Sequence, residues 1–155
     1  MFPTDSHFLE VVDRTPLVSI DLVVVDSDRR VLCGWRVNQP VRGFWFVPGG
    51  RILKDELLDD AFARIASAEL GVGDWRRADA GLLGVFEHLY DTNFAGAPEI
   101  TTHYVVLAYR IDVVDRPTPP DDQHSDYRWL SKTEAESDDF RSSLHPNTAA
   151  YFLYL

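Results

Sequence analysis

The segment GGRILKDELLDDAFARIASAELG, residues 49–71, combines glycines with widely spaced charged side chains. Gly50 is followed six residues later by Glu56, a further eight residues later by Arg64, and then by Glu69. Carboxylates beside a backbone turn can hold a hard cation, which takes carboxylate and carbonyl oxygens and keeps positions open for phosphate groups. Such residues could therefore hold a cation, provided that the turn and the helix after it bring them together.

Glu69 falls on the inward face of a predicted helix. Leu58, Phe62 and Ile65 recur at helical spacing over residues 56–70 and form the predicted buried stripe. Around such a helix Glu69 lies within about 20° of Leu58. A buried carboxylate needs a partner. The alternative is that Glu69 reaches water from a frayed helix end.

This spacing resembles the Nudix box, G-x5-E-x7-R-E-U-x-E-E-x-G-U, in which U is an aliphatic residue. The matching residues are Gly50, Glu56, Arg64, Glu69 and Gly71. In that family the glutamate and arginine brace the loop, whereas taken alone Glu56 and Arg64 could form a surface ion pair worth under about 1 kcal/mol. The resemblance implies an α+β Nudix fold, a mixed β-sheet sandwiched between helices (an α/β/α sandwich) with a loop-helix-loop motif.

Two positions depart from the box. The general pattern has acidic residues where this chain has Ile65 and Ala68, so Glu69 is the only one of the usual three that remains. Ordinary Nudix pyrophosphatases often use these carboxylates to hold several cations and activate water for attack on phosphorus. The chain has therefore either lost catalysis or attacks a different atom with a different base.

The departures fit a more specific resemblance, to the GDP-mannose mannosyl hydrolases, which runs from about residue 2 to residue 153. The segments that carry it are RTPLVSID (14–21), GFWFVPGGRILKDE (43–56), AELG (68–71), TTHYVVL (101–107) and DDQHSDYRWL (121–130). These include both altered box positions and a QH pair outside the box. They are therefore more specific than the box alone.

This resemblance implies hydrolysis of GDP-α-D-mannose, with GDP-glucose as a second substrate. Water displaces GDP at the anomeric carbon with inversion, giving β-mannose. One Mg²⁺ per subunit, replaceable by Mn²⁺, would assist the departure of GDP. The matching metal ligands are Gly49, through its carbonyl, Glu69 and Gln123; the matching catalytic or diphosphate-binding residues are Arg36, Arg51, Arg64 and Tyr104.

His124 is the candidate general base, because an imidazole titrates near working pH and can accept a proton from water. Taken alone, a histidine in a polar loop is solvated surface; the QH context favours catalysis. Asp21 interrupts an apolar strand, where an unpaired carboxylate would be costly. Strand alternation could instead point Asp21 to water together with Ser19. By resemblance, Asp21 orients the histidine or binds sugar.

Three further residues are candidates for substrate binding. His88 matches a substrate-facing position of the family, although without the family it reads as a structural residue of a strand. Phe2 and Phe8 could reach the guanine or a partner subunit. The family is dimeric, so the resemblance implies a homodimer.

Composition limits the class of protein. With 155 residues, 45% of them apolar, the chain is expected to form one domain, residues 1–155. A formal charge of −10 argues against nucleic acid and anionic membranes as partners, so a small anionic ligand needs local arginines or a cation. Cys33 is the only cysteine and is expected to be buried. With no signal peptide or membrane span in the sequence, a cytoplasmic location is expected.

Strand and helix patterns predict the elements that position these residues. A β-hairpin is expected over 17–25 and 30–37, with further strands near 43–47, 79–90, 102–113 and 126–130. Asp55 is the expected N-cap of the helix over 56–70, which Gly71 ends. Shorter helices are expected over 131–137 and 145–154, and a loop over 116–126.

Two other functions remain open. A conventional Nudix pyrophosphatase would cut between the phosphates and give GMP and mannose 1-phosphate, but the loss of acids at 65 and 68 speaks against it. A nucleotide-sugar sensor without catalysis would leave His124, Gln123 and Glu69 unexplained.

Overall fold

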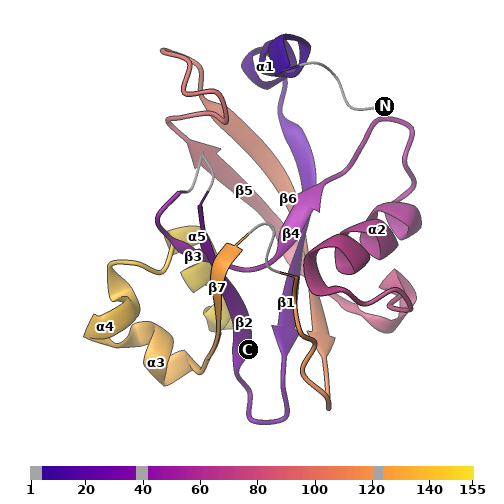
Figure 1. The fold of residues 1–155 in the computed structure, drawn as a ribbon, viewed down its shortest axis with the longest axis vertical. Helices are drawn as coiled ribbons and strands as arrows, with labels where there is room; N and C mark the ends of the chain where they lie inside the picture. Colours follow the sequence, from indigo (N-terminus) through magenta and orange to yellow (C-terminus); the bar gives the residue numbers. More distant parts are fainter. Residues whose placement is uncertain (1–4, 38–41, 121–123) are drawn as a thin grey trace.

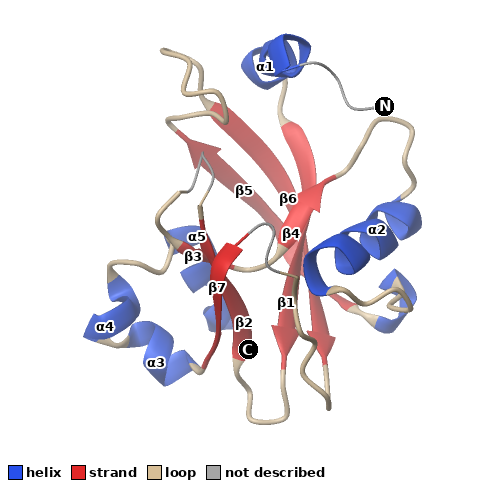
Figure 2. Ribbon diagram, viewed as in Figure 1, coloured by secondary structure: helices blue, strands red, loops and turns tan. Residues whose placement is uncertain are grey.

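A computed structural model describes residues 5–37, 42–120 and 124–155. Seven strands form one mixed sheet in the order β3-β2-β1-β6-β5, with β4 added to β1 and β7 added to β2. Helices cover both faces of this sheet, with α2 on one side and α3 to α5 on the other (Figure 2). The predicted α+β fold is confirmed.

Except for β4, the strands lie close to their predicted positions. Figure 1 labels them along the chain. Their bounds are β1 Leu17–Val25, β2 Val31–Arg36, β3 Trp45–Phe46, β4 Gly49–Arg51, β5 Gly81–Tyr90, β6 Thr102–Asp112 and β7 His124–Leu130. The predicted hairpin is therefore confirmed, and β7 begins two residues earlier than expected.

The hairpin of β1 and β2 opens away from its turn. The two strands pair at Val25 and Val31. Farther along, Ser19–Asp21 of β1 pair with β4, whereas Arg36 of β2 pairs with His124 of β7. The two strand pairs, β1 with β4 and β2 with β7, therefore diverge, and each pair carries candidate site residues.

The predicted glycine turn is in fact a short strand. Gly49 and Gly50 belong to β4 and pair with Asp21 and Ile20. Neither glycine has a positive φ. Sequence alone suggested a turn because glycine is common in turns, but here the pairing partner, β1, comes from far away in the chain.

Helix α2 (Leu58–Leu70) carries the second half of the box. It begins two residues later than predicted, its N-cap is Leu57, and Asp55 does not cap it because Asp55 adopts a left-handed φ of 65° in the loop before it. Gly71 ends the helix with a φ of 69°, as predicted. Phe62 and Ile65 are buried, but Leu58 is 37% exposed, so the predicted stripe loses its first member.

The remaining helices are short. Their bounds are α1 Asp5–Arg14, η1 Arg77–Asp79, α3 Lys132–Glu136, α4 Asp138–Arg141, α5 Pro146–Ala149 and η2 Ala150–Tyr154. The predicted helix over 145–154 is thus one α-helical turn, α5, continued by a 3-10 segment, η2. Neither α1 nor α4 was expected.

Two apolar cores lie on opposite faces of the sheet. Ile20, Leu22 and Val24 pack in the cluster that contains Phe62 and Ile65 of α2. Val23 and Val25 pack in the cluster that contains Cys33, Phe46, Tyr151 and Phe152. Because β1 is buried on both faces, a polar side chain in it, such as Asp21, lies inside the protein.

Candidate functional site

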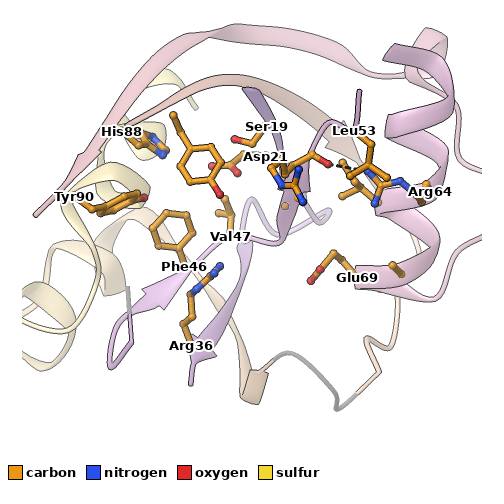
Figure 3. Close-up of a pocket in the computed structure, with 16 residues that line it drawn as sticks. Ser19, Asp21, Arg36, Phe46, Val47, Leu53, Arg64, Glu69, His88 and Tyr90 are labelled. Atoms are coloured by element: carbon orange, nitrogen blue, oxygen red, sulfur yellow. Dashed lines mark hydrogen bonds between the residues drawn. The ribbon is translucent and has the colours of Figure 1, made fainter. Parts of the chain in front are cut away.

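A pocket of about 410 Å³ lies where β1 and β2 diverge, beside β4 and α2 (Figure 3). Eight predicted site residues line it: Asp21, Arg36, Gly49, Arg51, Arg64, Glu69, His88 and Tyr104. They come from β1, β2, β4, β5, β6 and α2, so the fold gathers them from across 84 positions of sequence (21 to 104).

The other predicted residues are placed differently. Phe2 and Gln123 lie outside the described residues. The backbone of His124 belongs to β7 and pairs with Arg36, which lines the pocket, but its side chain lies outside the described part of the chain. Phe8 does not line the pocket.

Glu56 and Arg64 brace the loop before α2. Arg64 donates from Nε to Glu56 Oε2 at 2.7 Å and from Nη2 to Glu56 Oε1 at 2.9 Å. The same Nη2 donates to the carbonyl of Arg51 at 2.8 Å, and Glu56 Oε1 accepts from the Leu53 amide at 3.0 Å. The pair is thus tied to backbone at two points and is not a simple surface ion pair.

The brace predicts a pH-dependent stability. The hydrogen bond from Arg64 lowers the pKa of Glu56. A depressed pKa adds stability above the unfolded value of about 4.3 and loses it as the pH falls through the folded value. We therefore expect Glu56→Gln to lower the melting temperature by about 3 °C at pH 7, with the difference from wild type shrinking below about pH 4.

Thermal unfolding of both proteins between pH 3 and 7 measures this difference. Glu136→Gln, an exposed change in α3, is the matched control and should follow wild type at every pH. A pH-independent gap between wild type and Glu56→Gln would contradict an ionic brace.

Gly49 is required by close approach. A Cβ at this position would overlap Asp21 Oδ1 and lie 2.7 Å from the carbonyl oxygen of Ile20. Any larger residue would therefore displace β4 from β1 or turn the Asp21 carboxylate. Gly50 faces the other way, where an added Cβ would lie 3.0 Å from Ile65 Cγ1.

Asp21 and Ser19 are both buried, at 5% and 7% exposed. The alternative in which both side chains point to water is therefore wrong. Asp21 Oδ2 accepts a hydrogen bond from the Tyr151 hydroxyl at 2.6 Å. Burial raises the pKa of Asp21 to about 7, a rise limited by the bond from Tyr151 and by the charge of Arg36.

His88 is also buried and lies at the opposite end of the pocket from Glu69 in Figure 3. Its Nε2 lies 3.4 Å from the Tyr151 hydroxyl. Burial, together with the nearby His145, lowers the pKa of His88 to about 4, so the ring is neutral near pH 7.

The sequence of the chain matches a known protein family. The NUDIX domain family matches residues 15–151. The chain is a member of the Nudix family. Membership of this family supports a hydrolase.

One relative and two solved structures extend the comparison. This Nudix protein is 41% identical over 121 residues to the low-salt glycan biosynthesis protein Agl8 of Haloferax volcanii, covering 78% of this chain and 74% of that protein. A MutT NUDIX hydrolase from Burkholderia pseudomallei has a TM-score of 0.68 at 24% identity, with 92% and 99% of the two chains covered. The NUDIX domain of Shewanella oneidensis NrtR, crystallised with ADP ribose, has a TM-score of 0.63 at 20% identity, covering 98% and 96%. Both structural likenesses concern the fold.

The two altered positions of the Nudix box lie at the pocket. Ile65 and Ala68 both line the pocket, so apolar side chains stand where the general box has carboxylates. Glu69 also lines the pocket and is only 7% exposed, so it does not escape to water at a frayed helix end. A buried carboxylate that lines the same pocket as the backbone of β4 supplies, with that backbone, the kind of oxygen donors that a hard divalent cation takes.

Sequence reasoning missed several residues of the Nudix site. Tyr90 and Phe46 line the pocket, and Asn147 of α5 donates from Nδ2 to the Tyr90 hydroxyl at 3.2 Å. Tyr151 lies behind the pocket and bonds Asp21. Aromatic residues in a strand or an apolar helix give no local signal that separates such roles from core packing.

Phe8 contacts the site through Arg51. The Arg51 guanidinium lies 4.2 Å from the centre of the Phe8 ring, and Phe8 packs on Phe94 with ring centres 5.0 Å apart. Helix α1 and the 91–101 loop thereby meet over one of the arginines of the pocket.

No helix in the described ranges is long and apolar enough to cross a membrane.

Proposed function

We propose that this Nudix protein hydrolyses GDP-mannose, and also GDP-glucose, to GDP and free sugar. Water attacks the anomeric carbon with inversion. The observation that carries this proposal is a pocket in which Arg36, Arg51 and Arg64 accompany a single box carboxylate, Glu69. The similarity to a glycan biosynthesis protein supports a nucleotide-activated sugar as the substrate class.

Charge supports a diphosphate ligand. The chain carries a formal charge of −10, so its overall field repels anions. Arg36 and Arg51 bring positive charge to the pocket, whereas the charge of Arg64 is paired with Glu56. Guanidinium groups match phosphate oxygens in geometry. A leaving GDP gains negative charge as the bond to the sugar breaks, and fixed cationic groups stabilise that charge.

Glu69, the Gly49 carbonyl and Gln123 would hold one Mg²⁺, with Mn²⁺ as a substitute. The donor set fits, because the buried Glu69 carboxylate and the backbone of Gly49 line the same pocket and both offer oxygen. When bound, the cation supplies Lewis-acid stabilisation of the departing diphosphate.

His124 is the proposed general base. Its backbone pairs with Arg36, which lines the pocket, and a neutral imidazole can take the proton from an attacking water. Asp21 lines the pocket and is proposed to orient the histidine or to bind the sugar. The protein is proposed to act as a homodimer on a small nucleotide sugar.

Product analysis tests the proposal. Incubation with GDP-mannose and Mg²⁺, followed by anion-exchange chromatography, should give GDP and mannose. GMP and mannose 1-phosphate would instead identify a conventional pyrophosphatase. Binding of the nucleotide sugar without turnover would identify a sensor.

A further inference from the structure

Tyr151 joins two pocket residues from behind. It belongs to η2, its side chain is 0% exposed, and it is not part of the pocket lining. Its hydroxyl lies 2.6 Å from Asp21 Oδ2 and 3.4 Å from His88 Nε2. These two partners come from β1 and β5 and both line the pocket, so one hydroxyl links pocket residues of two strands.

The Tyr151 hydroxyl can donate only one of its two hydrogen bonds. A tyrosine hydroxyl has one proton to donate, and at pH 8, above the Asp21 pKa of about 7, the carboxylate is mostly ionised and can then only accept. The short bond to Asp21 therefore uses the Tyr151 proton. The contact with His88 then requires the ring to donate from Nε2, which leaves Nδ1 of the neutral ring unprotonated.

Asp21 is confined on its other side as well. Its Oδ1 lies so close to Gly49 that a single added carbon there would overlap it. One carboxylate oxygen is thus held by Tyr151 and the other lies against β4. The carboxylate consequently has little freedom to rotate while Tyr151 is bound.

Hydrogen bonding and packing hold α5 and η2, the segment that contains Tyr151, in place. His145 Nδ1 accepts from the Asn147 amide at 3.1 Å at the start of α5. The Tyr151 ring packs edge-on against Phe86, with ring centres 4.9 Å apart. Apolar contacts thus hold the ring in place independently of its hydroxyl.

We propose that the Tyr151 hydroxyl is a positioning residue that fixes the orientation of the Asp21 carboxylate and the Nε2–H tautomer of His88. This role rests on the proposed function, because both groups line the pocket that would take the nucleotide sugar. Tyr151 is fully buried and does not line the pocket, so it would act only through Asp21 and His88. It acts by presenting Asp21 and His88 to the pocket in one arrangement.

Tyr151→Phe tests the role with little change in shape. Loss of one charge-assisted hydrogen bond should lower kcat about 10- to 100-fold, while KM changes by less than about threefold. Tyr154→Phe, in the same segment but 56% exposed, is the matched control and should keep wild-type kinetics. In an Asp21→Ala background, Tyr151→Phe should cost much less than it does alone, because the two changes remove the same bond.

Side-chain ¹⁵N NMR of His88 at pH 8 gives a readout independent of activity. Wild-type protein should show a neutral ring protonated at Nε2, and Tyr151→Phe should lose that preference. A ring protonated at Nδ1 in wild type, or wild-type kcat in Tyr151→Phe, would overturn the inference. If the wild-type protein hydrolyses no nucleotide sugar, the proposed function fails and the NMR spectrum alone decides the role of Tyr151.

Discussion

Replacing Glu69 with glutamine should weaken Mg²⁺ binding by at least about tenfold, because a neutral amide oxygen replaces the one carboxylate of the proposed ligand set. Glu69 is the only residue of the usual acidic trio that the box retains, so no neighbouring box carboxylate can compensate. The side chain is 7% exposed and lines the pocket, so the change acts at the site and not at the surface.

Titration with Mn²⁺ followed by electron paramagnetic resonance measures this affinity without substrate. Glu136→Gln removes an exposed carboxylate of α3 and should bind the cation as wild type does. Unchanged affinity in Glu69→Gln would remove Glu69 from the metal site. The turnover of Glu69→Gln should recover in part at high Mg²⁺ concentration, because the defect is one of binding.

Replacing His124 with glutamine should lower kcat by about 10²- to 10⁴-fold, the range expected for the loss of a general base. Glutamine keeps a polar side chain of similar length but cannot take a proton from water. The variant should therefore bind Mg²⁺ with nearly wild-type affinity. This pattern is the reverse of that expected for Glu69→Gln.

Steady-state kinetics together with the same Mn²⁺ titration separates the two roles. His7→Gln, an exposed change in α1, controls for the loss of a histidine as such. A drop in metal affinity as large as the drop in kcat would assign His124 to the metal site and contradict its role as base.

Local patterns predicted the scaffold of the site well. The apolar runs on either side of Asp26 gave the β1–β2 hairpin, and helical spacing placed Phe62 and Ile65 in the core with Glu69 beside them. These signals are local because each depends on a repeat within one element. The prediction was wrong for Leu58, because the first turn of α2 is exposed and the buried residues of this helix begin at Ala61.

Long-range contacts were not predictable in the same way. From sequence, Gly49 and Gly50 predict a turn. In the structure β1 lies beside them, and Gly49 is needed because a side chain there would overlap Asp21. Tyr151 lies 130 residues from Asp21, and its neighbours in AYFLY read as apolar core. Neither the sequence around Asp21 nor that around Tyr151 indicates that the two residues are in contact.

The most direct test of carbon attack is hydrolysis of GDP-mannose in ¹⁸O-labelled water with Mg²⁺, followed by mass spectrometry of the products. Attack at the anomeric carbon places the label in free mannose and leaves GDP unlabelled. Label in GDP, or in any other phosphate product, would show attack on phosphorus and contradict the account.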